Sequence, residues 1–157
     1  MQPKLSRETK LTEHFTLGEL TKPDMVVPDD QVLINLVKLC CALEDLRLII
    51  NAYHPRPDGS SSWIIITSGL RSVERNTAVG GSPKSQHLLG LAADCYCPQI
   101  SLRSMATLAT HVPAFNNGGI GVYPDNGFCH LDCRLNGPAR WLFVNGKMLE
   151  LPKEWLE

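Results

Sequence analysis

Two histidines and one aspartate stand in two short motifs whose chemistry suits a metal ion. His87 and Asp94 lie seven residues apart in SQHLLGLAAD, and His130 follows in GFCHLD. Two imidazoles and one carboxylate are typical of catalytic zinc, because three protein ligands leave a position for water, whereas structural sites close all four positions, usually with thiolates. Zinc lowers the pKa of such a water toward ~7, which makes hydroxide available at neutral pH. The pattern predicts one zinc ion bound by these three residues.

The strands that we expect around these motifs place the polar side chains on one face. Side chains alternate between faces along a strand, so in a strand over 128–134 His130 shares its face with Asp132. In a strand over 91–97, Asp94 likewise points away from the neighbouring thiols. Asp132 is therefore the predicted carboxylate for proton transfer. The opposite, apolar face would carry Cys95, Cys97, Cys129 and Cys133.

Each of these residues also has an ordinary interpretation. A single histidine is more often exposed or satisfied in a core than bound to metal, and Asp94 could cap a turn. Asp132 could simply form an ion pair with Arg134. The six cysteines include no CxxC pair. Without a secretory signal, we expect free and mostly buried thiols rather than disulfides or zinc ligands.

Length and composition indicate one ordinary globular domain. The 157 residues are 43% hydrophobic and 20% charged, with a formal net charge of -1, which gives no general attraction to nucleic acid or anionic membrane. No apolar run is long enough to span a bilayer. The N-terminus, MQPKLSRETKLTEHF, has no apolar signal region, so we expect synthesis in the cytoplasm. We predict an N-terminal arm over 1–13 and a single domain over 14–157.

The order of the expected elements favours an α+β domain with a central antiparallel sheet and flanking helices over a doubly wound α/β fold. Apolar residues recur at three- and four-residue steps over 30–51, which predicts the longest helix. Shorter helices are expected over 16–20, 73–78 and 102–111. Strands are expected over 63–67, 91–97, 118–123 and 128–134, followed by a hairpin of 141–144 and 147–151 around Asn145-Gly146.

As a set, the motifs resemble those of the zinc D-Ala-D-Ala carboxypeptidase-like peptidases, which include murein endopeptidases and phage lysins and share a fold with hedgehog signalling domains. HFTLGEL, the long helix, SGLRS, AVGGSPKSQH and GIGVYPDNGFCHLD follow one another in the family's order. The resemblance implies zinc held by His87, Asp94 and His130, and attack of zinc-bound hydroxide on amide bonds of peptidoglycan stem peptides or cross-links, usually involving a D-amino acid. Arg71 matches the family arginine that contacts substrate.

Two further residues complete the predicted substrate contacts. Ser85 would either hydrogen-bond the substrate or brace its loop, and Tyr123 lies in the segment that leads to the last ligand. The implied partner is a peptidoglycan peptide, and we expect a monomer. The enzyme would act on the cell wall after release, or as part of a phage particle.

One position departs from the family pattern. Several branches carry a catalytic acid three residues before the last histidine ligand, where this chain has Gly127. Asp125 lies nearby in an expected turn, where aspartate is common for conformational reasons, and Asp132 matches a branch that ends in His-x-Asp. If neither acts as a base, the chain would be a non-catalytic module pinned by zinc that binds cell wall or protein, or an architectural part of a virion or tail.

Overall fold

Six strands form one mixed sheet in the order β1-β2-β4-β3-β5-β6. The computed structural model describes residues 5–156. Neighbouring strands pair antiparallel, except that β3 and β5 run parallel. The predicted α+β class with flanking helices is confirmed, although one pair of the sheet is parallel. The strands are β1 (Ile65–Ser68), β2 (Ala92–Tyr96), β3 (Gly119–Tyr123), β4 (Phe128–Asp132), β5 (Ala139–Val144) and β6 (Lys147–Glu150).

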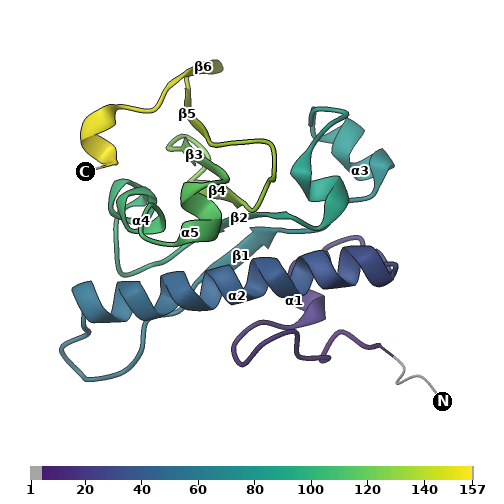
Figure 1. Ribbon diagram of the computed structural model, residues 1–157, viewed down its shortest axis with the longest axis horizontal. Coiled ribbons are helices and arrows are strands. Elements are labelled where there is room, and N and C mark those ends of the chain that lie inside the picture. The colour runs from purple at the N-terminus through teal and green to yellow at the C-terminus, as the bar shows by residue number, and fades with distance from the viewer. Residues whose placement is uncertain (1–4, 157) are drawn as a thin grey trace.

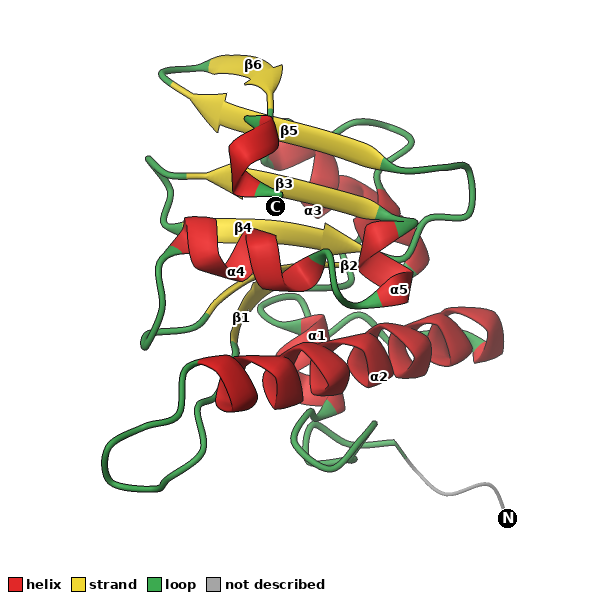
Figure 2. Ribbon diagram, turned by 60° about the vertical axis from the view of Figure 1, so that its left-hand side comes forward, coloured by secondary structure: helices red, strands yellow, loops and turns green. Residues whose placement is uncertain are grey.

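Helices lie on both sides of this sheet. Figure 1 shows α2 running along the base of the sheet, and Figure 2 shows α4 and α5 in front of the sheet with α3 behind it. Asp29 and Ser101 accept hydrogen bonds from backbone N–H groups and so cap α2 and α4. The helices are α1 (Leu17–Thr21), α2 (Asp30–Tyr53), α3 (Val73–Ala78), α4 (Leu102–Ala109) and α5 (Pro113–Asn116), with 3-10 turns η1 (Gln86–Leu89) and η2 (Lys153–Trp155).

The hydrophobic core lies on the face of the sheet that α4 and α5 cover. Cys95 and Cys129 are fully buried there, and the thiol of Cys129 lies 3.4 Å from the carbonyl oxygen of Leu102 at the start of α4. All six cysteines are free, as the sequence predicted. Strand alternation therefore keeps the thiols of these strands on the opposite side of the sheet from Asp94 and His130.

The segment that precedes α1 is tied to that helix by its backbone. The N–H of Leu17 donates to the carbonyl of Thr9 at 2.8 Å, and the N–H of Gly18 donates to the carbonyl of Arg7 at 2.9 Å. Residues 1–4 of the predicted arm lie outside the described residues, and the boundary at residue 14 stays a prediction. Within 5–156, no helix has both the length and the apolar character needed to cross a membrane.

Burial predicts how the thiols react. Cys41 is exposed, whereas burial raises the pKa of Cys129 and of Cys133 to about 12. At pH 8 we expect a chromogenic disulfide reagent to modify Cys41 rapidly, the half-buried Cys133 slowly because of its raised pKa, and the four buried thiols only after unfolding. Cys41→Ser should abolish the rapid phase. Rapid modification of Cys95 in the folded protein would contradict the described core.

Candidate metal centre

Three side-chain atoms from distant parts of the chain converge on one point. Asp94 Oδ1 lies 3.1 Å from His87 Nε2 and 2.9 Å from His130 Nδ1, and the two ring nitrogens lie 3.2 Å apart. A tetrahedral zinc ion with bonds near 2.0–2.1 Å holds its ligand atoms about 3.3 Å apart. The three atoms therefore have the spacing of one face of such a tetrahedron. Their residues form a group that could hold a metal ion.

Pairing between strands and one short turn bring the three residues together. Asp94 on β2 lies directly opposite His130 on β4, on the face away from α4. His87 comes from η1, which is stapled to the loop after β1 because the N–H of Arg71 donates to the carbonyl of His87 at 3.1 Å. All three side chains are buried, with exposed fractions of 2%, 5% and 8% for His87, Asp94 and His130.

The hydrogen-bond partners of the two rings assign their protons. His87 Nδ1 lies 2.7 Å from the carbonyl oxygen of Gly69, which only accepts, so Nδ1 carries the proton and Nε2 offers a lone pair. His130 Nε2 lies 2.9 Å from the carboxylate of Asp132, so His130 Nδ1 likewise offers a lone pair. Two lone pairs and a carboxylate oxygen thus face one another without a donor, which is the arrangement that a bound cation stabilises.

The charge states of the ligands suit a cation as well. Burial lowers the pKa of His87, which keeps the ring neutral. Burial alone would raise the pKa of Asp94, but the neighbouring His130 and His87 rings hold it well below its ordinary value. For His130, Asp132 and Asp94 outweigh burial and raise the pKa. A cation therefore competes with a proton at His130 Nδ1.

Arg71, predicted to contact substrate, and Ser85, predicted either to do so or to brace its loop, both support the candidate ligands. Arg71 Nη2 donates to Asp94 Oδ2 at 2.6 Å, and its Nε donates to Ser68 Oγ at 2.9 Å. The side chain of Arg71 is only 14% exposed, so this is not a surface ion pair. Ser85 Oγ accepts from the N–H of His87 at 3.3 Å and caps η1, which is the bracing role. Substrate contact by either residue stays a prediction.

The geometry argues against the predicted role of Asp132 as general base. Asp132 is fully buried, and its carboxylate lies at the edge of the His130 ring remote from Asp94. Its oxygens accept hydrogen bonds from the N–H of Gly119 at 2.9 Å and from the guanidinium of Arg134 at 2.6–3.1 Å. A carboxylate so fully bonded has no free lone pair directed at a reacting water.

The alternative base, Asp125, is also engaged elsewhere. Asp125 is exposed in the turn between β3 and β4, and its Oδ2 accepts from the N–H of Asn145 at 2.7 Å. This bond joins the β3–β4 turn to the β5–β6 turn. Gly127 completes the same turn with a φ of 75° that favours glycine.

Trp141 is a residue of the site that the sequence reasoning missed. Its indole lies beside the ring of His130, with 5.1 Å between the ring centroids. A Cβ at Gly121, the β3 residue between these two side chains, would overlap the indole. Trp141 Nε1 donates to the hydroxyl oxygen of Tyr123 at 2.9 Å. The small residue at 121 is the only sequence signal for this contact, and it has meaning only once β5 is known to pair with β3.

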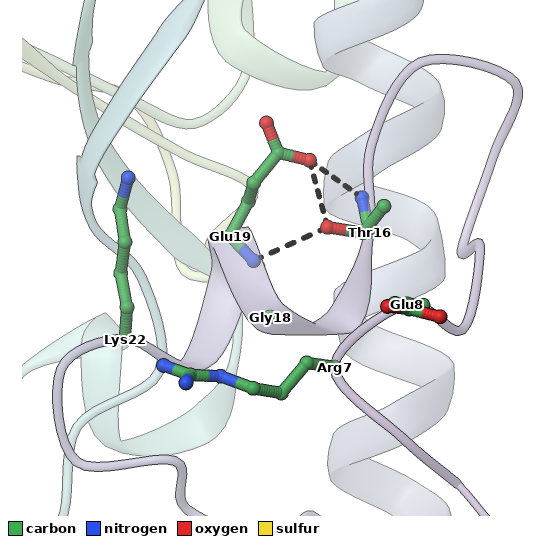
Figure 3. Close-up of a pocket in the computed structure, with 6 residues that line it drawn as sticks. All are labelled: Arg7, Glu8, Thr16, Gly18, Glu19 and Lys22. Atoms are coloured by element: carbon green, nitrogen blue, oxygen red, sulfur yellow. Dashed lines mark hydrogen bonds between the residues drawn. The ribbon is translucent and has the colours of Figure 1, made fainter.

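Two open hollows lie apart from the three ligand residues. One, of about 340 Å³, lies beside α1, where Figure 3 shows Glu19 turned back to the backbone and hydroxyl of Thr16. Those bonds, of 2.8 and 2.9 Å, occupy the carboxylate in a helix cap. The other hollow, of about 510 Å³, is lined by His54, Pro55, Arg56, Pro57, Trp63 and Gln99.

Comparison with known proteins agrees with the residues assembled here. A family model described as Peptidase M15 matches residues 14–132. The matched segment runs from the residues before α1 to the end of β4 and contains all three ligand residues, whereas Trp141 lies beyond it. No curated protein matches the sequence.

The geometry predicts one divalent zinc ion per chain. His87→Ala, Asp94→Ala and His130→Ala should each weaken zinc binding by more than the roughly 10–100-fold that loss of an outer partner costs. Calorimetric titration and metal analysis of the dialysed proteins measure this. His54→Ala and His111→Ala, which change histidines outside the group, should bind zinc normally. Full zinc affinity in His130→Ala would contradict the assigned ligand set.

Proposed function

The chain belongs to the peptidase M15 family, and from this membership we propose that it is a zinc-dependent peptidase that hydrolyses amide bonds in the stem peptides or cross-links of peptidoglycan. The observation that carries the zinc assignment is the convergence of three buried acceptor atoms from His87, Asp94 and His130. Bonds that involve a D-amino acid belong to the same proposal. We also propose that the protein acts at the cell wall, which it would reach after release or as part of a phage particle.

The proposed chemistry needs an electrophile whose ligands stay fixed. Zinc would polarise the scissile carbonyl and activate water at neutral pH. His87 and His130 present lone pairs because Gly69 and Asp132 hold the protons of their other nitrogens. Burial of the ligands keeps bulk water from screening the charges of the site, which strengthens their action on a substrate.

Arg71 would act through Asp94 and through its charge. Its bond to Asp94 Oδ2 leaves Oδ1 directed toward the two histidine nitrogens. The guanidinium is permanently charged and lies beside the centre, where the oxygen of an attacked amide becomes negative. Arg71 would therefore both orient a ligand and stabilise that oxygen.

Asp132 would be a positioning residue. Its bond to His130 Nε2 fixes the ring orientation and raises the basicity of Nδ1, as carboxylates behind metal-bound histidines do. Arg134 and the N–H of Gly119 keep the carboxylate in this place. This role explains the His-x-Asp spacing, since alternate residues of β4 share one face.

A second candidate function is favoured by one specific observation. Asp132 and Asp125 are both bonded to other groups, and Gly127 stands at the position where relatives carry an acid. A centre without a free carboxylate fits a module that binds zinc and wall peptides without cleaving them. Turnover, rather than zinc binding, distinguishes the two functions.

Digestion of purified peptidoglycan tests the proposed activity. The zinc-loaded protein should release peptide fragments whose masses identify the cleaved bond, and a chelator should stop the release until zinc is restored. Asp94→Ala is the inactive control because it removes a ligand. If the wild-type protein carries stoichiometric zinc, binds muropeptides and releases nothing, the non-catalytic function is correct.

Asp132→Asn separates a positioning role from a base. If Asp132 is a positioning residue, Asp132→Asn should lower zinc affinity about 10–100-fold, and excess zinc should restore most of the peptidase activity. Thermal unfolding must be followed in parallel, because the change also leaves Arg134 without its carboxylate partner. Asp125→Asn, on the exposed turn, is the matched control and should change neither zinc affinity nor peptidase activity. Loss of turnover in Asp132→Asn at full zinc occupancy would restore the base assignment.

A further inference from the structure

The face of the sheet that carries the ligands has a second row of side chains beside the metal row. His130 on β4, Gly121 on β3 and Trp141 on β5 stand in register across three strands. Two residues further along β3, Tyr123 stands opposite Phe128, with ring centroids 4.7 Å apart. On the other side Tyr123 meets the ring of Phe143, with centroids 5.4 Å apart. Packing from both sides fixes the direction of the Tyr123 ring.

Trp141 connects this second row to the metal centre. The absence of a side chain at Gly121 lets the indole lie between the ring of His130 and the hydroxyl of Tyr123. Indole nitrogen is a donor and never an acceptor. The 2.9 Å bond therefore uses a lone pair of the Tyr123 oxygen and leaves the hydroxyl proton to point elsewhere. Within residues 5–156, Trp141 is the one polar partner found for that hydroxyl.

The Tyr123 side chain keeps its hydroxyl proton at neutral pH and is partly exposed. Burial raises the pKa of Tyr123, and the negative charge of Asp94 acts in the same direction. The side chain is nevertheless only partly buried.

We propose that Tyr123 donates its hydroxyl proton in a hydrogen bond to a carbonyl or carboxylate oxygen of the peptide at the metal centre, and that Trp141 positions this hydroxyl. The inference rests on the proposed function, because the ligand is the peptide substrate of that centre. It gives the predicted substrate contact of Tyr123 a donor atom and an acceptor, and it assigns the orientation of that donor to Trp141, a residue beyond the segment that the family model matches. A donor fixed before the substrate arrives costs no reorganisation when charge develops on the accepted oxygen.

Two conservative substitutions and their combination test the inference. Tyr123→Phe removes the donor and keeps the ring, and should lower kcat/KM about 10- to 100-fold. Trp141→Phe keeps an aromatic ring beside His130 but removes the N–H, and should lower kcat/KM about 5- to 10-fold because the hydroxyl loses its orientation. If Trp141 acts through Tyr123, adding Trp141→Phe to Tyr123→Phe should cause no further loss.

Controls separate this effect from damage to the centre or the fold. Zinc affinity and the midpoint of thermal unfolding should stay close to the wild-type values in all three variants. Tyr53→Phe and Trp63→Phe make the same chemical changes at residues that are 66% and 45% exposed, and should leave kcat/KM unchanged. Full kcat/KM in Tyr123→Phe would overturn the substrate contact, and additive losses in the double variant would overturn the positioning role of Trp141.

The same variants remain informative if the wild-type protein has no turnover. That result would defeat the proposed peptidase activity by itself. Calorimetric titration with soluble muropeptides would then replace kcat/KM as the measurement. Weaker binding by Tyr123→Phe, with unchanged zinc affinity, would support the contact, and equal binding would overturn it.

Discussion

This structure depends on one constraint: three acceptor atoms are buried from water and held about as far apart as the ligand atoms of a single zinc ion. The lone pairs of His87 and His130 and the carboxylate of Asp94 would repel one another if nothing lay between them. A positive charge placed among them, from a proton or a metal ion, would relieve this repulsion. Hydrogen bonds with Gly69, Asp132 and Arg71 orient the three side chains.

The supporting residues are themselves held by elements that are remote in sequence. Gly69, whose carbonyl binds His87, packs so closely against the carbonyl of Leu20 in α1 that no Cβ would fit, and the N–H of Leu70 donates to the same carbonyl at 2.7 Å. The HFTLGEL and SGLRS segments thus act together. The first holds the loop, and the loop orients one ligand through Gly69 and another through Arg71.

The sequence indicated the candidate ligands because their signals are local, and it missed what depends on the order of the strands. Strand alternation alone places Asp94 and His130 away from the thiols, and the structure agrees. Alternation also puts Asp132 on the face of His130, but it does not say which edge of the ring the carboxylate meets, and that edge decides between base and support. The role of Trp141 could not be predicted, because Trp141 comes close to the centre only through the parallel pairing of β3 with β5. Periodicity carries no information on which strands become neighbours.

The charges around the centre bear on whether the metal is a structural pin or an electrophile. Two carboxylates, Asp94 and Asp132, are each paired with a guanidinium, Arg71 and Arg134, so the four charges cancel before any ion binds. A structural zinc site usually offsets the ion with thiolates, whereas here the thiols of the neighbouring strands lie on the other face of the sheet. A divalent ion would therefore bring two uncompensated positive charges to a buried site. Such a site attracts the oxygen atoms of a ligand and stabilises negative charge that develops on them. This charge balance fits hydrolysis of an amide better than a purely structural role.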